Sequence, residues 1–513
     1  ATLFIGIPSM NTLIRKTSMA AAITCALAGF GGAAHAAGEA RNVIFFLGDG
    51  MGPVTVTAAR IYKGEKQLAA RPGSLASAER ATLTMQTLGT AARVKTFSRD
   101  GQTTDSAPSM AAYMTGVKMN NEVISMSAET VAYEPGTEKQ YISGEDSTCL
   151  PGNGTPAVTL LELSKAKGRA VGAVSTTRVG HATPAATYAH ICNRNGYNTI
   201  AEMSVPGAPR YNPALGDGID VLMGGGLRNY LPKGSGSRRT DDLNLLAMMQ
   251  TAGYSVVRSG TELGALSTAG TGKLLGLFSP SEMAYELDRA NQNLDQPSLT
   301  QMTTKALDVL SKNASGFFLM VEGGRIDHAL HGSNAKRALE DTLAFDAAIA
   351  AAKAYMEQKD PGLANTLIVV TADHDHSIAF NGYGKIGTPI LGKVVDYRTG
   401  ELAKAGDGKP YTTLVFGNGG RPADSTASQV NAEDGNKPWI APVRAADRED
   451  LTRVDTTQDN FLQEVGVVLG EPGAETHGGG DVMLYAGGAG AKVFKGTMDN
   501  TKVFSKVREA AGL

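Results

Sequence analysis

The chain has 513 residues, which is enough to bury a large hydrophobic core. Hydrophobic residues make up 42% of it and charged residues 19%, a composition that excludes the disordered and fibrous classes. The net charge of -2 at pH 7 argues against a nucleic-acid-binding surface, because such surfaces carry a strong excess of Lys and Arg.

Residues 1–36 have the features of a secretory signal peptide with a few residues upstream. Arg15 and Lys16 supply positive charge, residues 19–30 are apolar and rich in Ala, and Ala34-His35-Ala36 has the form of a cleavage site. We therefore expect a periplasmic or secreted protein. The apolar run is too short to span a membrane, and no later stretch reaches about 18 uninterrupted apolar residues, so we expect no transmembrane segment in the mature chain.

The first predicted strand, residues 41–47, is followed by Gly48-Asp49-Gly50. In open α/β sheets, functional sites gather at the carboxyl ends of strands, and glycines allow another group to approach Asp49 closely. A plain turn is the alternative interpretation of this short motif.

A helix is predicted to begin near Ser106, after the polar run Thr103-Thr104-Asp105. A hydroxyl at this position would face the free amides of a helix N-terminus, where a phosphate group binds well. The alternative is that Asp105 or Ser106 only caps the helix.

Two cysteines, Cys149 and Cys192, remain once the predicted leader, which contains Cys25, is removed. An even number of cysteines in an oxidising compartment favours a disulfide between them. Two unpaired buried thiols are the alternative.

Beyond the turn-rich residues 125–155, which we expect to form a surface loop, patterns typical of helices and buried strands alternate. Strands are predicted at residues 170–175, 219–223, 317–321, 366–371 and 482–486, and helices at 158–166, 241–250, 298–310 and 337–356. This alternation predicts an α/β fold with a mainly parallel central sheet sandwiched by helices. Residues 37–513 are expected to form one such domain, with an irregular insertion at about 380–471.

Glu322 follows the predicted strand 317–321, and Asp327 and His331 come next in the sequence. In a helix, Asp327 and His331 share a face because they are four residues apart. Two carboxylates and an imidazole in one segment suit a hard or borderline divalent metal. The alternative is a strand followed by an ordinary charged helix.

Histidines gather in the segments that follow predicted strands. Six of the eight lie there: His181, His328, His331, His374, His376 and His477. Together with Asp49, Glu322, Asp327 and Asp373, they could hold more than one divalent ion. Mixed imidazole and carboxylate ligands favour Zn²⁺, and an all-oxygen subset favours Mg²⁺. The clustering predicts a hydrolase with several metal ions.

Six motifs, in order between residues 41 and 485, resemble those of the alkaline phosphatase family. They are Gly48-Asp49-Gly50-Met51-Gly52, Asp105-Ser106-Ala107, His181-Ala182-Thr183-Pro184-Ala185, Val321-Glu322-Gly323 with Asp327 and His331, Thr371-Ala372-Asp373-His374, and Glu475-Thr476-His477-Gly478. The resemblance implies the fold of that family, two zinc ions and one magnesium ion per chain, and a homodimer. The insertion is placed like the family's crown region.

The resemblance also implies roles for individual residues. Asp327, His331 and His477 would hold the first zinc, Asp49, Asp373 and His374 the second, and Asp49, Thr183 and Glu322 the magnesium. Ser106 would be the nucleophile, and Arg194 would bind the phosphate group with His181 nearby. Supporting positions would be taken by Asp105, His328 and His376. The family's animal-type pattern has His at both 181 and 328, whereas the enterobacterial members have Asp and Lys.

These roles imply a secreted phosphomonoesterase of broad specificity that hydrolyses small-molecule phosphate monoesters through a phosphoserine intermediate. A phosphodiesterase or phosphonate hydrolase of the same superfamily is the first alternative. A non-catalytic periplasmic binder of phosphate or metal is a more distant one, since it would need no nucleophile at a helix end.

Overall fold

The computed structural model describes residues 40–420, 448–469 and 474–513. The predicted signal peptide, residues 1–36, lies outside these ranges, as does part of the predicted insertion. Among the described residues, no helix combines the length and the apolar character that crossing a membrane requires.

A ten-stranded sheet forms the centre of the fold. From one edge to the other, its strands are β17 (Gly496–Asp499), β2 (Thr90–Lys95), β16 (Val482–Gly488), β10 (Thr366–Thr371), β1 (Asn42–Gly48), β9 (Phe317–Gly323), β5 (Ala170–Arg178), β6 (Val221–Gly225), β8 (Leu274–Leu277) and β7 (Ser255–Val257). Every strand of this sheet except β16 runs in the same direction. The prediction of a mainly parallel α/β sheet is confirmed.

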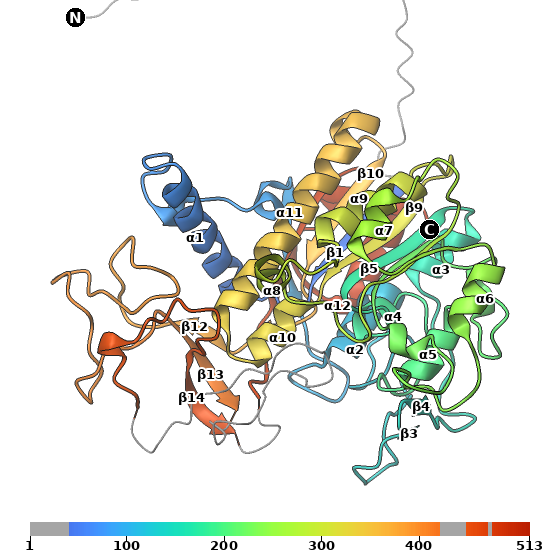
Figure 1. Ribbon diagram of the computed structural model, residues 1–513, viewed down its shortest axis with the longest axis horizontal. Coiled ribbons are helices and arrows are strands. Elements are labelled where there is room, and N and C mark those ends of the chain that lie inside the picture. The colour runs from blue at the N-terminus through green and yellow to red at the C-terminus, as the bar shows by residue number, and fades with distance from the viewer. Residues whose placement is uncertain (1–39, 421–447, 470–473) are drawn as a thin grey trace, which may run out of the picture. The chain divides into compact units, whose positions relative to one another are not determined.

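Two adjacent aromatic residues of β1 show that helices cover both faces of the sheet. Phe45 packs against Tyr113 of α2 (Ser106–Thr115), with ring centroids 5.9 Å apart. Phe46 packs against Phe345 of α11 (Ala335–Lys359), also at 5.9 Å. Because successive side chains of a strand point to opposite faces, α2 and α11 lie on opposite sides of β1 (Figure 1).

The other helices extend these two layers. α11 packs against α1 (Pro53–Ala70) and α9 (Leu299–Leu310), and α2 packs against α3 (Leu160–Ala166), α4 (Ala182–Ala185) and α12 (Asn500–Ala511). Shorter helices are α5 (Tyr197–Met203), α6 (Leu245–Thr251), α7 (Gly260–Ala265), α8 (Glu286–Asn291) and α10 (Arg325–His331). Helices α1 and α12 are absent from the prediction, although Pro53 at the first position of α1 is a known helix-start signal.

The helix predicted at residues 241–250 begins later, as α6. The side chain of Asn244 caps α6 by accepting a hydrogen bond from the backbone N of Ala247 at 3.0 Å. Asp241, at the predicted start, instead pairs with Arg239 at 2.5 Å. A capping residue inside the predicted range therefore sets the true boundary.

The region predicted as a surface loop, residues 125–155, is buried where it begins. Ser125 and Met126 are both buried, and Ser125 Oγ donates a hydrogen bond to Ala186 O at 2.7 Å. The prediction is wrong for these two residues and for the buried Thr130 and Ala132, because the start of the segment packs into the protein interior. Further along, β3 (Ile142–Ser143) and β4 (Asp146–Ser147) form a short antiparallel pair.

Smaller sheets accompany the predicted insertion. β12 (Ile378–Phe380), β13 (Leu414–Gly420) and β14 (Glu464–Leu469) form a three-stranded sheet (Figure 1). The two-residue strands β11 (Asp375–His376) and β15 (His477–Gly478) pair in the antiparallel sense, with His376 opposite His477. This pairing joins two motifs that the insertion separates in the sequence.

The substitution Phe345→Ala is expected to lower the free energy of unfolding by about 3–5 kcal/mol, because it removes a fully buried ring between α11 and β1. The midpoint of thermal unfolding, measured by calorimetry at a fixed scan rate, should fall accordingly. Phe380→Ala is the matched control: its ring is 42% exposed, so a change within about 1 kcal/mol is expected. Equal losses in both variants would contradict the packing role given to Phe345.

Candidate active site

The carboxyl ends of three adjacent parallel strands form the floor of the candidate site. In the register of β1, β9 and β10, Leu47 lies opposite both Glu322 and Thr371. Asp49 follows β1, Glu322 lies at the end of β9, and Asp373 follows β10. Because neighbouring parallel strands end at the same edge of a sheet, the three carboxylates come together there. All three are fully buried.

Two glycines beside Asp49 allow the floor to pack closely against the next loop. A Cβ at Gly50, where φ is +65°, would lie 2.4 Å from His376 Nε2, and one at Gly52 would lie 1.6 Å from Asp375 Oδ1. Neither position has room for a side chain. The motif around Asp49 is thus more than a turn, since it is the place where two loops of the site meet.

Ser106 is the first residue of α2, and its hydroxyl belongs to this cluster. Its Oγ lies 3.0 Å from His374 Nε2 and 3.3 Å from Asp49 Oδ1. The cap of the helix is Asp105, whose side chain accepts a hydrogen bond from the backbone N of Ala107 at 3.3 Å. Asp105 is therefore the residue that caps the helix, and the hydroxyl of Ser106 instead contacts His374 and Asp49.

A second cluster forms around Asp327, in the first turn of α10. Its Oδ1 lies 2.7 Å from His376 Nε2 and 3.4 Å from the Nε2 atoms of both His331 and His477. His331 faces Asp327 because the two are four residues apart on one helix, and His477 approaches from β15. The ring of His477 stacks on that of His374 with centroids 3.5 Å apart, which joins this cluster to the first.

Glu475 belongs to the motif that contains His477, but the sequence prediction assigns it no role. Its buried Oε2 contacts His376 Nδ1 at 2.6 Å, and its Oε1 accepts hydrogen bonds from the backbone N and the Oγ of Ser377 at 2.7 and 2.6 Å. Its backbone O lies 2.5 Å from His331 Nδ1. Glu475 thereby orients two of the imidazoles in the second cluster.

Two hydroxyls of β5 that hold Glu322 are missed by the sequence prediction. Ser175 Oγ donates a hydrogen bond to Glu322 Oε2, and Thr177 Oγ1 donates to the same oxygen at 3.1 Å. Residues two apart in a strand face the same side, so two hydroxyls at this spacing in a buried strand are the signal that could have indicated them. Thr183, fully buried in α4, also lies beside this carboxylate.

Crowding of buried carboxylates raises their pKa values. Burial and the nearby Asp49 raise the pKa of Asp373 to about 8. Burial raises the pKa of Glu322 to about 8 despite the hydrogen bond from Ser175. Burial, together with Asp327 and Glu322, holds the pKa of Asp49 well above its ordinary value. Carboxylates that lie close together in a low-dielectric site take up protons unless a cation neutralises their charge.

The imidazoles of the site fall into two classes. Burial lowers the pKa values of His181 and of three imidazoles in the two clusters: His331, His374 and His477. These three are held neutral, which is the form that binds metals. Burial opposes the charge of His376 as well, but Glu475 and Asp327 raise its pKa well above the ordinary value. His376 is therefore better suited to donate a hydrogen bond to Asp327 than to bind a metal.

The donor atoms of both clusters have the spacing that zinc requires. Two ligands that each lie about 2.0–2.1 Å from one tetrahedral ion are about 3.3 Å apart. His374 Nε2 lies 3.2 Å from Asp49 Oδ1 and 3.5 Å from Asp373 Oδ2. In the cluster around Asp327, the distances among the carboxylate, His331 and His477 are 3.0 and 3.4 Å. Both sets fit a zinc ion.

Each of the three carboxylates at the floor of the site has a buried oxygen with no hydrogen-bond partner among the described residues: Asp49 Oδ2, Glu322 Oε1 and Asp373 Oδ2. Buried polar atoms without partners cost free energy, and a cation would satisfy all three. Asp49 and Glu322, with the hydroxyl of Thr183 close by, make an all-oxygen set of the kind that Mg²⁺ prefers. The residues present therefore fit a magnesium ion as well.

His181 and His328 face each other beside the floor, with ring centroids 5.4 Å apart. With Glu282 they form a further group of potential ligand atoms. Glu282 is already paired with Arg178, whose Nε lies 2.6 Å from Glu282 Oε1. Because the charge of Arg178 disfavours a cation at this place, we assign no metal to the group.

Arg194 lies beside the start of α2. Its Nη1 donates a hydrogen bond to Asp105 Oδ1, and its Nη2 lies 3.1 Å from His181 Nε2. Asp105 directly precedes Ser106, so this network places a guanidinium next to the serine. The structure thus brings together all the residues that the sequence predicts for the site, with Asp105 as the link between hydroxyl and guanidinium.

Comparison with known proteins shows what the whole chain is similar to. A family model described as "Alkaline phosphatase" matches residues 40–513. The chain is 36% identical to the tissue-nonspecific isozyme of alkaline phosphatase from Mus musculus, over 90% of this chain and 82% of that protein. It is 34% identical to an alkaline phosphatase from Gadus morhua, over 91% of this chain and 90% of that protein.

Solved structures give the same fold. The alkaline phosphatase of Thermus thermophilus shares 26% of residues with this chain and superimposes with a TM-score of 0.63, covering 93% of this chain and 92% of its own. The enzyme of the Antarctic bacterium TAB5 is 20% identical, with a TM-score of 0.58 and coverage of 92% and 99%. At that identity the second likeness concerns the fold alone.

The stability of the metal-free protein is expected to fall as the pH rises from about 6.5 to 8. Asp49, Asp373 and Glu322 bind protons in the folded state that the unfolded chain has already lost, so raising the pH removes stability. The neutral histidines act in the opposite sense, but only below about pH 6.5. Thermal unfolding measured across this range, with and without added Zn²⁺ and Mg²⁺, checks the prediction.

The metals should remove most of this loss, because they replace the protons on the carboxylates. Glu322→Gln is the matched variant: with one titrating group fewer, its metal-free form should show a weaker dependence on pH. A metal-free protein whose unfolding midpoint stays constant or rises between pH 6.5 and 8 would contradict the raised pKa values.

Proposed function

Because the chain belongs to the alkaline phosphatase family and is a phosphoric monoester hydrolase, we propose that Ser106 is its nucleophile at a site for two zinc ions and one magnesium ion. The observation that carries this proposal is the position of Ser106 Oγ, 3.0 Å from His374 Nε2 and 3.3 Å from Asp49 Oδ1. No other cluster in the described residues combines a hydroxyl at a helix start with two complete sets of ligands.

The ligand sets follow the two clusters and the all-oxygen group. The first zinc would be held by Asp327, His331 and His477, the second by Asp49, Asp373 and His374, and the magnesium by Asp49, Glu322 and Thr183. When bound, these ions would supply positive charge that stabilises a serine alkoxide and the departing alcohol oxygen. His376 would keep Asp327 in place through its 2.7 Å contact.

In the first step, Ser106 Oγ forms a bond to phosphorus as the bond from phosphorus to the alcohol oxygen breaks, and the proton of the serine hydroxyl ends on the departing alcohol. The product is a phosphoserine. Water then attacks the phosphorus from the opposite side, which releases inorganic phosphate and restores the hydroxyl. Two successive inversions predict net retention of configuration at phosphorus. Ser106 is the nucleophile in the first step and the leaving group in the second. Its place at the start of α2, beside the buried floor of the site, suits both roles.

Arg194 would bind the phosphate group, with His181 beside it. A planar guanidinium can donate two parallel hydrogen bonds to two phosphate oxygens. Asp105 holds one edge of the guanidinium, which reduces the number of orientations it must give up on binding. His328 would support His181 through their edge-to-face ring contact. None of these contacts addresses the alcohol part of the substrate, so we propose broad specificity towards phosphate monoesters.

We also propose that residues 1–36 direct export and are removed, and that the mature chain acts as a homodimer in the periplasm or outside the cell. The positive and apolar pattern of the leader supports export. The disulfide between Cys149 and Cys192 supports an oxidising compartment, since such bonds seldom persist in the cytosol. The dimer rests on family resemblance alone.

Ser106→Ala is expected to lower phosphomonoesterase turnover by at least about 10³-fold, because the covalent step loses its nucleophile. Zinc content should be unchanged, since the side-chain ligands remain. Steady-state rates with p-nitrophenyl phosphate and metal analysis of the same sample check both points. Ser109→Ala is the control, because the Ser109 hydroxyl donates only to backbone carbonyls of the same helix. Wild-type turnover in Ser106→Ala would remove Ser106 from the mechanism.

Phosphate monoesters should be hydrolysed much faster than diesters. A second ester group would occupy one of the oxygens that Arg194 is proposed to grip, and would remove negative charge from the group that the cations bind. The ratio of kcat/KM for p-nitrophenyl phosphate to that for bis(p-nitrophenyl) phosphate is the measurement. A ratio below one would favour a phosphodiesterase, and failure to trap any phosphoserine would favour a non-catalytic binder.

A further inference from the structure

The segment that carries Arg194 is not part of the central sheet. It pairs instead with a short stretch that follows α2. Ile124 and Ile191 exchange two backbone hydrogen bonds of 3.0 Å, and the backbone N of Arg194 donates to Glu122 O at 2.8 Å. We call residues 122–124 and 191–194 the clamp ladder. The position of the guanidinium therefore depends on two irregular segments.

Glu122 joins both halves of the phosphate-binding network through its backbone. Its carbonyl accepts from Arg194 N, and its own N donates to Asp105 Oδ2 at 2.5 Å. Its φ of +69° places it in the left-handed region, which residues other than glycine seldom occupy. A non-glycine residue stays in this conformation only when its surroundings hold it there.

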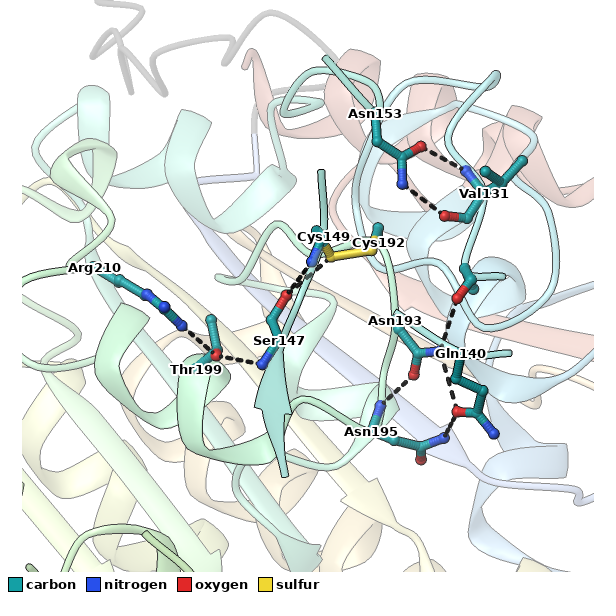
Figure 2. The surroundings of a disulfide bond; sticks show 11 residues. Val131, Gln140, Ser147, Cys149, Asn153, Cys192, Asn193, Asn195, Thr199 and Arg210 are labelled. Carbon is teal, nitrogen blue, oxygen red and sulfur yellow. Dashed lines mark hydrogen bonds between the residues drawn. A yellow bond between two sulfur atoms is a disulfide. The ribbon is translucent and has the colours of Figure 1, made fainter. Parts of the chain in front are cut away.

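The Cys149–Cys192 disulfide is a covalent hold on this ladder. Cys192 lies within the ladder, two residues before Arg194, and Cys149 lies just after β4, 43 residues earlier in the sequence. Figure 2 shows the bond among the side chains that surround it. Ser147, two residues from Cys149, is fixed in turn by a hydrogen bond of 3.0 Å from its N to Thr199 Oγ1. The disulfide thus ties the ladder to an ordered loop.

The side-chain amides of two residues next to Cys192 also bind the ladder to the loop that precedes β3. Asn193 Nδ2 donates to Ala132 O and to Gln140 Oε1, both at 3.2 Å, and Asn195 Nδ2 donates to Gln140 Oε1 at 3.0 Å (Figure 2). Residues 192 to 195 are therefore held by one covalent bond and several weak ones. Each of the weak bonds contributes only modestly on its own.

We propose that the Cys149–Cys192 disulfide is a positioning element for phosphate binding, which holds the clamp ladder so that the Arg194 guanidinium stays beside Ser106. This proposal rests on the proposed role of Arg194. None of the proposed metal ligands lies in the ladder or in the loop that carries Cys149. Breaking the disulfide should consequently weaken phosphate binding and leave metal binding intact.

The expected kinetic signature follows from where the phosphate group is bound. Arg194 would contact it in the substrate complex, in the transition state and in the product complex. Loss of its orientation should therefore raise KM and the inhibition constant of inorganic phosphate together, with a smaller effect on kcat. If the disulfide served folding alone, breaking it in the folded enzyme would change neither KM nor the inhibition constant of phosphate.

The test uses the metal-loaded enzyme, reduced with tris(2-carboxyethyl)phosphine. The phosphine is oxidised to its oxide, with oxygen from water, as the disulfide becomes two thiols. After reduction we expect KM for p-nitrophenyl phosphate and the inhibition constant of phosphate to rise by about 3- to 30-fold, with kcat within about twofold. Zinc per chain, measured after gel filtration, should not change. Reoxidation should restore both constants.

Cys149→Ala is the matched variant. It should show the raised constants without reductant and no further response to the phosphine, whereas the unmodified enzyme should respond. Unchanged KM and phosphate inhibition after complete reduction, verified by counting free thiols, would overturn the proposal. Loss of zinc in parallel with the rise in KM would also overturn it, because the disulfide would then act on the whole site.

A pair of substitutions at Glu122 tests the ladder without touching the cysteines. Glu122→Gly and Glu122→Val both remove the carboxylate, but only glycine accepts the left-handed backbone readily, and a β-branched residue opposes it. Glu122→Val should raise KM and the phosphate inhibition constant, and Glu122→Gly should change them far less. Equal effects of the two substitutions would show that the backbone conformation of the ladder does not position Arg194.

Arg194→Ala, measured in the same assays, separates this proposal from the proposed function. If it leaves KM and phosphate inhibition unchanged, the role of Arg194 as phosphate ligand fails. If it raises both constants while reduction of the disulfide does not, the proposed function stands and only the positioning role of the disulfide fails.

Discussion

The mutual repulsion of buried carboxylates is the constraint on which the rest of this site depends. Asp49, Glu322 and Asp373 meet at the ends of adjacent parallel strands, where burial removes them from the bulk solvent that would screen their charges. Without a cation they must hold protons, which is why their pKa values are raised. Such a site is stable with charged carboxylates only when metal ions are bound. Cations are therefore required both to stabilise the fold at this place and to carry out the chemistry.

The surrounding residues prepare the site for those ions. Histidines that burial keeps neutral stand at distances of 3.0 to 3.5 Å from the carboxylates and from one another. Other residues hold the side chains of the site in place. Glu475 contacts His376, and the β5 hydroxyls donate hydrogen bonds to Glu322. Rigid ligands lower the cost of reorganisation when a charged phosphate group is bound and its charge moves during the reaction.

The side of the site that carries Arg194 is built differently. The proposed metal ligands extend from the central sheet and the segments that follow its strands, whereas Arg194 lies in an irregular segment that pairs with residues 122–124 and is bound to Cys149 by a disulfide. Regular strands position the ligands through many cooperative hydrogen bonds, while an irregular segment needs individual anchors. Asp105 connects the two parts, because it caps the helix that begins with Ser106 and also pairs with Arg194.

By itself the sequence determined the parallel sheet, since strand periodicity is a local pattern, and its motifs, through their resemblance to a known family, indicated which side chains the structure brings together at the strand ends. His190, outside those patterns, pairs with Glu162 at 2.7 Å, as an ordinary buried histidine does. Only the tertiary structure decided the distances between the ligand atoms of each proposed set, the support that Glu475 and the hydroxyls of β5 give them, and the left-handed conformation of Glu122 beside Arg194. These contacts join residues far apart in the chain, and their distances depend on how strands and loops pack, which no local pattern encodes.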